Sequence, residues 1–175
     1  MPLYNPPAAG GGASLITTKK LSADLSNSTT TFAKVTNLDQ VVGVGTWAFQ
    51  YFIRHQAAAT TTGIKFTVNH SGTVTSFMAT SRKLEATTAA STGAQSQVFA
   101  TFGLISGGGI RAKSTTAPLG VSISHDAANA DTMTVIEGLM VVTVSGNIEL
   151  YHASEVAAAS TIKADSMLIL TGPSS

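Results

Sequence analysis

The sequence predicts an all-β protein: an antiparallel β-sandwich of the jelly-roll type, preceded by a short extended N-terminal arm. Several segments alternate apolar and polar residues with a period of two, the pattern of half-buried strands. Clusters of Gly, Ser, Asn and Asp separate these segments at short, regular intervals. The chain of 175 residues is long enough for one hydrophobic core. We therefore expect an arm over residues 1–14 and a sandwich domain over residues 15–175.

The arm has the sequence MPLYNPPAAGGGAS. Its prolines and triple glycine favour neither a helix nor a sheet register. Two interpretations stay open: a disordered terminus, or an arm that docks on a partner. Leu3 and Tyr4 favour docking, because apolar side chains are costly to leave in water. The expected contact residues of a docking arm are Pro2, Leu3, Tyr4, Pro6 and Pro7.

The sandwich opens with SNSTTTFAKVTNLD at 26–39, which predicts a strand that begins at a sheet edge. The clearest strand is TWAFQYFIRHQ, where Trp47, Phe49, Tyr51 and Ile53 alternate with a second row. Further strands are expected at 63–71, 73–81, 96–105, 119–124, 132–144, 147–155 and 161–170. We read 84–97 as an exposed loop and 154–161 as a connection. The triplet at 145–147 predicts a tight hairpin.

The chain carries few charges for a protein in water. Charged residues make up 11% and hydrophobic residues 43%, where an ordinary soluble domain has about 25% charged residues. No run approaches the ~18 to 20 consecutive apolar residues of a membrane-spanning helix. We therefore expect contact between subunits to cover apolar surface. The interface candidates are Tyr51, Phe52, Met140 and Tyr151.

Several functions are disfavoured by composition. The net charge of +1 comes from scattered residues, so the clustered basic surface of a nucleic-acid-binding protein is missing. There is no cysteine, which excludes disulfides and thiolate metal sites. The N-terminus lacks the pattern of a secretory signal, which predicts synthesis in a cytoplasm.

We expect no catalytic site. Ser124, His125 and Asp126 are the residue types of a hydrolase triad, but in an extended segment the histidine faces away from its two neighbours. A turn that begins at Asp126 is the favoured interpretation. The glycines at 107–109 lack the following helix of a phosphate-binding loop.

We likewise expect neither a metal nor a cofactor. The four histidines are far apart in sequence, which predicts partly exposed residues at strand ends. A metal site on a symmetry axis, with one histidine from each copy, stays open as an alternative. The histidines are His55, His70, His125 and His152.

Three stretches together resemble a domain of tailed-bacteriophage virion proteins. They are LSADLSNSTTTFAKVTNL at 21–38, the segment at 47–69 that ends in ATTTGIKFTVN, and the segment at 134–170 with Glu137-Gly138, ASEV and IKADS. The resemblance covers roughly residues 18–171. This domain occurs as trimeric head-decoration (cement) proteins and as terminal domains of tail fibres or tail tips.

The resemblance implies a cofactor-free homotrimer on the outer surface of the virion, synthesised in the host cytoplasm. A short arm, in place of a long shaft, favours a decoration protein that binds the major capsid protein and stabilises the head. A tail-fibre or tail-tip receptor-binding domain is the alternative. A jelly-roll lectin or carbohydrate-active enzyme is an alternative of another class, which the single Trp47 and three tyrosines disfavour because sugars stack on aromatic rings.

Overall fold

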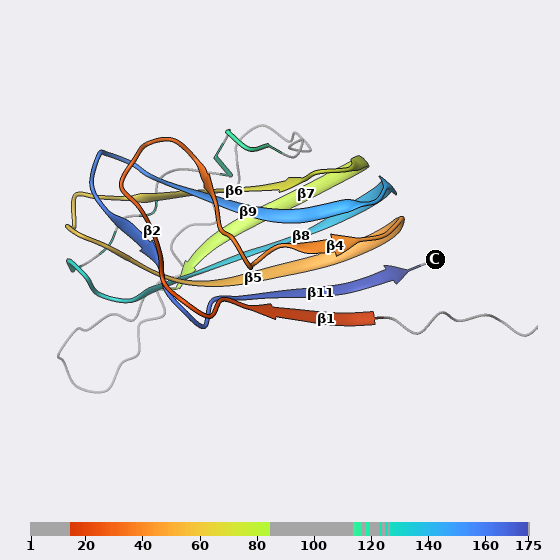
Figure 1. The fold of residues 1–175 in the computed structure, drawn as a ribbon, viewed down its shortest axis with the longest axis horizontal. Helices are drawn as coiled ribbons and strands as arrows, with labels where there is room; N and C mark the ends of the chain where they lie inside the picture. The colour runs from red at the N-terminus through yellow and green to blue at the C-terminus, as the bar shows by residue number, and fades with distance from the viewer. Residues whose placement is uncertain are drawn as a thin grey trace, which may run out of the picture.

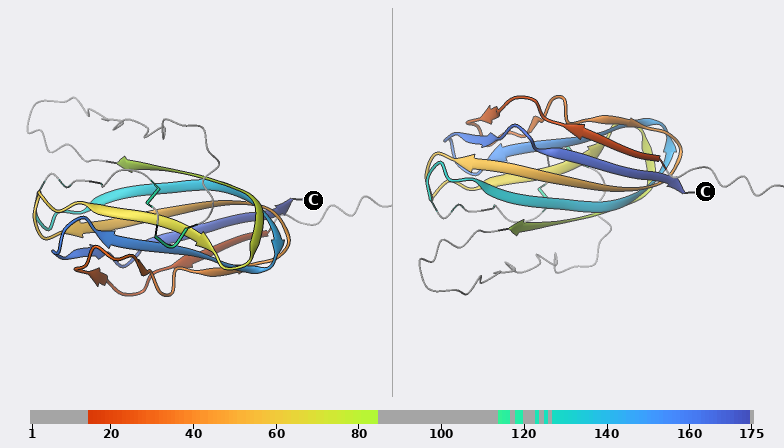
Figure 2. Two further views of the ribbon diagram at one scale, coloured as in Figure 1. Left: turned by 90° about the horizontal axis from the view of Figure 1, so that it is seen from above. Right: turned by 90° about the horizontal axis from the view of Figure 1, so that it is seen from below.

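The computed structural model describes residues 15–84, 114–116, 118–119, 123, 125 and 127–174. These residues form two antiparallel β-sheets that pack face to face (Figure 1, Figure 2). The predicted antiparallel β-sandwich is confirmed, and its jelly-roll detail is not. No described helix is long and apolar enough to cross a membrane. The arm, the strand expected at 96–105, nearly all of the loop expected at 84–97 and the glycines at 107–109 lie outside the described residues.

Sheet A has seven strands built around β5. They are β1 Leu15–Lys20, β2 Leu25–Asn27, β5 Gly45–Ala57, β7 Thr73–Leu84, β8 Thr132–Val144, β10 Ser160–Ile162 and β11 Met167–Ser174. On one side β5 pairs with β8, which pairs with β7. On its other side β5 pairs with β11 along its first half and with β10 at its end. Strands β1 and β2 lie outside β11 and β10.

Sheet B has four strands built around β9. They are β3 Ala33–Lys34, β4 Gln40–Val42, β6 Ile64–His70 and β9 Gly146–Ser154. Strands β3 and β4 pair with one side of β9, and β6 pairs with the other. Part of the outer edge of β6 is covered, because Ile123 forms a bridge with Ile64 and Leu119 N donates to Phe66 O at 2.8 Å. Of the strand expected at 119–124, the described residues show only these contacts of Leu119 and Ile123 with β6.

The core lies between the two sheets and follows the predicted alternation of β5. Every second residue from Trp47 to Ala57 is buried, and the residues between them are half-buried. From sheet B, Ile64, Phe66 and Val68, which alternate along β6, are also buried. Of the large apolar residues in the segment 26–39, Val35 and Leu38 are fully buried, whereas Phe32 is half-buried. One apolar row from each sheet therefore supplies the core.

Three predictions about strand continuity were wrong. The segment at 26–39 contains β2 in sheet A and β3 in sheet B, so the chain crosses between the sheets there. The strand expected at 161–170 is divided into β10 and β11 by a turn in which Asp165 has a φ of 69°. The triplet at 145–147 forms no hairpin, because β8 belongs to sheet A and β9 to sheet B.

The β8–β9 corner packs directly against the β6–β7 corner, and both need glycine. A Cβ on Gly146 would lie 2.2 Å from Gly72 N, and one on Gly72 would lie 2.1 Å from Val144 O. Ser71 N donates to Asn147 O at 2.9 Å and links the corners. The turn residues were recognisable in the sequence, but a turn does not specify which sheet the next strand joins.

Gly138, in the middle of β8, should tolerate no side chain. A Cβ there would lie 2.1 Å from Met78 O and 2.6 Å from Phe49 Cζ. We expect Gly138→Ala to cost on the order of 3 kcal/mol of unfolding free energy and to lower the melting temperature by about 10 °C. Thermal and denaturant unfolding measure both. Gly43→Ala is the matched control, because nothing lies within 4 Å of its Cβ position. Equal stability of the two variants would contradict this account of the core.

Candidate interaction face

The outer face of sheet A is a broad surface with exposed apolar side chains. Strand register places one row across β7, β8, β5, β11 and β1, composed of Met78, Leu139, Ala48, Thr171 and Ile16. On β7, β8, β5 and β11, their neighbours Phe77, Met140, Trp47 and Leu170 face the core. The exposed fractions are 67% for Ile16, 52% for Met78 and 49% for Leu139. Large apolar side chains this exposed on a regular sheet face indicate a contact surface.

A second apolar row crosses the same five strands four residues further along β5. It consists of Arg82, Val135, Phe52, Met167 and Lys20, in spatial order. Its three central side chains are apolar, and its two ends are cationic. Val135 is almost fully buried although it is on the outer face, where Phe52 and Arg82 flank it in the register.

Between these rows lies a mostly uncharged polar row. It consists of Thr80, Glu137, Gln50, Ile169 and Thr18. Gln50 Nε2 donates to Glu137 Oε2 at 3.0 Å, and Arg82 Nη2 lies 3.7 Å from the same oxygen. The polar groups of the central strands are therefore paired within the chain, which lowers the cost of covering them.

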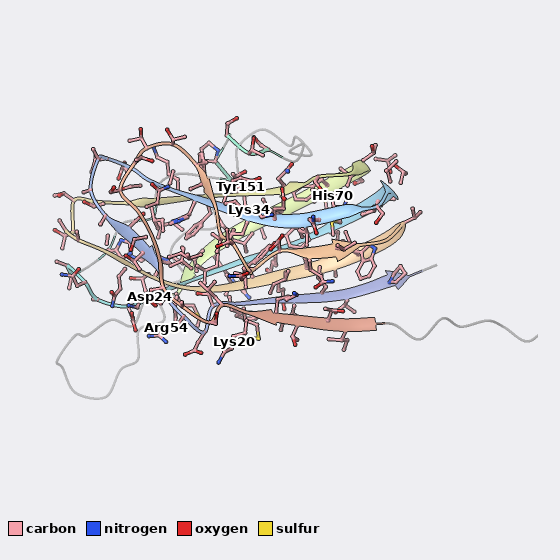
Figure 3. All side chains as sticks on the ribbon, viewed as in Figure 1. Lys20, Asp24, Lys34, Arg54, His70 and Tyr151 are labelled. Carbon is pink, nitrogen blue, oxygen red and sulfur yellow. The ribbon has the colours of Figure 1, made fainter. Side chains whose placement is uncertain are left out.

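Other charges form a rim at one end of the face. Figure 3 shows Lys20, Asp24 and Arg54 gathered there. Arg54 Nη2 lies 2.7 Å from Asp131 Oδ2, Lys20 Nζ lies 2.6 Å from Asp165 Oδ1, and Lys163 pairs with Asp24. An apolar centre beside a solvated, charged rim is the usual anatomy of a protein–protein interface.

Two of the four interface candidates need correction. Tyr51 and Met140 are fully buried in the core of the single chain, so neither can present a side chain to another copy. The alternation of β5 places Phe52 on the outer face, where it is half-buried. Tyr151 is half-buried on the outer face of sheet B. The expected arm contacts, Pro2, Leu3, Tyr4, Pro6 and Pro7, lie outside the described residues.

Met78, Leu139 and Ile16 are exposed apolar residues of this face that sequence reasoning did not single out. In β8 both alternating rows contain apolar residues, so the sequence does not say which row faces out. The pairing decides it: Met140 lies opposite buried Trp47, and Leu139 lies opposite Ala48. The signal for Met78 was available, since Phe77 and Met78 are adjacent in a strand and must face opposite ways.

The outer face of sheet B carries a compact polar network instead. Glu149 accepts hydrogen bonds from Lys34 Nζ at 2.9 Å, Asn69 Nδ2 at 2.9 Å and Tyr151 OH at 3.1 Å. Lys34 Nζ also lies 2.8 Å from Asp39 Oδ2, and Figure 3 shows Lys34 beside Tyr151. Burial alone would raise the pKa of Glu149, but hydrogen bonds from Lys34 and Asn69 lower it below its ordinary value. The network holds β3, β6 and β9 together by mutually satisfied groups.

The expectation of partly exposed histidines was wrong. All four are buried: His55 and His70 at 0% exposure, His152 at 2% and His125 at 3%. His55 continues the buried row of β5, and His70 and His152 continue buried rows of β6 and β9, so the period-two alternation indicates these three positions. Ser124 and Asp126 lie outside the described residues. Within the described part of the chain, no three potential metal-ligating side chains come together.

Comparison with known proteins adds no relative. No family model matches the chain, and neither a curated protein nor a solved structure is significantly similar to it.

Proposed function

We propose that this chain is a bacteriophage structural protein, a capsid decoration protein that assembles as a homotrimer and binds the major capsid lattice. The observation that carries the proposal is the apolar outer face of sheet A. The number three and the capsid partner come from the sequence resemblance. The low fraction of charged residues, 11%, is consistent with surface that is covered on assembly.

The outer face of sheet A fits a second copy of the chain in size and chemistry. Five strands about 4.8 Å apart and about eight residues long, at about 3.4 Å per residue, present roughly 650 Å². A standard interface buries about 800 Å² on each partner. The exposed centre is apolar, and the charges on it are paired within the chain. Contact through this face would cover Ile16, Met78 and Leu139 together.

A different surface suits the capsid. Residues 1–14 lead into Leu15, which pairs with Gly172 at the end of the sandwich where β4 continues into β5 (Figure 1). The chain exposes further valines at this end: Val41 at 61%, Val44 at 63% and Val144 at 55%. The arm and these valines would approach the capsid from the same side.

The test is rebinding of the purified protein to particles from which it has been stripped. A decoration protein binds the head, saturates at many copies per particle and raises the temperature at which the head releases its DNA. Light scattering should give three times the chain mass of 17.8 kDa. Saturation at a few copies confined to the tail would replace the proposal with a fibre or tail-tip role. Binding to glycans without binding to particles would favour a lectin.

A further inference from the structure

The most exposed apolar side chains on the outer face of sheet A lie near its two edges. Ile16 is on the edge strand β1, Met78 is on the edge strand β7, and Leu139 is on β8 beside β7. On the central strand β5, the side chains that point outward are only half-exposed to solvent or less. A contact that covers the exposed apolar surface must therefore reach both sides of the face.

Both edges of sheet A are open in the described part of the chain. Among the described strands, β1 pairs only with β11, and β7 pairs only with β8. Natural edges are commonly protected by bulges and lysines. Here a register shift occurs near Val74 at the start of β7, and Lys19 and Lys20 end β1. The middle of β7 and the first half of β1 carry neither device, so these stretches can accept a neighbour.

Met78 and Ile16 are the two ends of one row across the sheet. The pairing of antiparallel strands runs perpendicular to the strands, so the ends of a row lie at about the same height along them. Rotation about an axis parallel to the strands leaves that height unchanged. Such a rotation therefore brings Met78 of one copy to the level of Ile16 of the next.

The direction of the trimer axis follows from the proposed capsid contact. Leu15 pairs with Gly172 at the end of the strands that leads to the arm (Figure 1), and Val41, Val44 and Val144 are exposed at the same end. Three copies present this end to one capsid surface only if the axis runs along the strands. When the outer faces of sheet A turn toward that axis, β5 lies nearest to it and the edge strands meet at the corners.

The other rows are compatible with this meeting of edges. The polar row ends in Thr80 on β7 and Thr18 on β1, whose hydroxyl groups can hydrogen-bond to each other. The third row ends in Arg82 and Lys20, which are both cationic. Each is ion-paired with a carboxylate of its own chain, which weakens the repulsion between them.

We propose that the outer faces of sheet A form a closed three-sided prism around the trimer axis, in which β7 of each copy lies against β1 of the next. Met78 and Leu139 of one copy then contact Ile16 of its neighbour. This arrangement rests on the proposed function and adds to it which surfaces meet. The contact is heterologous, with two different edges in each interface, and three such contacts close the ring.

The test is disulfide trapping of the full chain with Ile16→Cys and Met78→Cys combined. The chain has no cysteine, so these are its only thiols. Within one chain the two positions are four strand spacings, about 19 Å, apart, well beyond the Cα separation of about 7 Å that a disulfide allows. A disulfide between them must therefore join two copies.

After mild oxidation, the denatured and unreduced double variant should shift from one chain mass of 17.8 kDa to three. Either single variant should stay at one chain mass, because its thiol faces no other thiol. An equal mixture of the two single variants, unfolded and refolded together, should give linked pairs and nothing larger. The matched control is Val41→Cys with Val156→Cys, at exposed positions outside sheet A, which should stay at one chain mass.

Two cross-linking patterns would overturn the arrangement. Linked pairs in a single variant indicate a two-fold contact between identical edges, and a ladder beyond three chains indicates an open filament. Light scattering before oxidation tests the trimer separately. Trimers that form no Ile16–Met78 link overturn the prism but leave the proposed function standing, whereas monomers overturn both. If the double variant fails to fold, the mixture of single variants decides.

Discussion

Replacing Met78 and Leu139 together with glutamate is expected to convert the assembled protein into monomers of 17.8 kDa. The two side chains are directly opposite each other on the outermost strand β7 and its neighbour β8, exposed on the outer face of sheet A. Each substitution removes an apolar contact worth about 1.5–3 kcal/mol when buried and adds a charge that the interface would have to desolvate. The dissociation constant should rise by at least about 100-fold. Light scattering at micromolar concentration measures the mass.

The matched control for this double variant is Val41→Glu with Val156→Glu. Both valines are exposed, at 61% and 44%, and neither lies on sheet A. This control should keep the oligomeric mass and the melting temperature of the unaltered protein. If the double variant at Met78 and Leu139 also keeps the full oligomeric mass, then another surface joins the subunits. A monomeric unaltered chain at the same concentration would exclude the proposed assembly altogether.

Deletion of residues 1–12 is expected to abolish decoration of stripped particles while leaving the oligomer intact. The deleted residues precede β1, which begins at Leu15, so every strand that the structure describes is kept. Three arms on one body act at high effective concentration, and their combined gain over a single arm is about 10² to 10⁴ in affinity. Because the deletion removes all three arms, the apparent affinity for particles should fall by at least that factor. Co-sedimentation with purified particles measures it.

A variant of unchanged length separates the chemistry of the arm from its presence. Leu3→Ser with Tyr4→Ser keeps the prolines and glycines but removes the apolar side chains expected to bind. It should lose most of the affinity that the deletion loses. Undiminished binding of the deletion variant would show that the sandwich itself carries the capsid contact, and the valines at its arm-bearing end would then be the first residues to substitute.

Most of the strand pattern could be predicted because it depends on neighbouring residues alone. In β5 the alternation that runs through Trp47 and Phe49 fixes which side chains point the same way, and the structure buries the row that contains both. The two interface candidates on that strand were chosen because their side chains are apolar or amphipathic, without regard to the row to which each belongs. Tyr51 belongs to the inner row and Phe52 to the outer one, so the alternation itself distinguishes the two.

Strand partnership could not be predicted, because it joins residues far apart in the chain. Met140 and Leu139 are equally apolar, and only the pairing of β8 with β5 places one in the core and the other outside. The contact between His55 and His125 spans 70 positions and has no local signature. His55 continues the buried row of β5, but nothing in the sequence indicates that it contacts His125.

The sequence by itself therefore determined that this chain forms an antiparallel β-sandwich and where most of its strands lie. It also determined that few charged residues are available to cover the surface. These properties follow from local alternation and from composition. Only the tertiary structure decided that 145–147 is a corner between sheets, that one row of sheet A exposes Ile16, Met78 and Leu139, and that His55 contacts His125. The physical reason is that a side chain's exposure depends on which strand packs beside it, and many long-range contacts must form together before that is fixed.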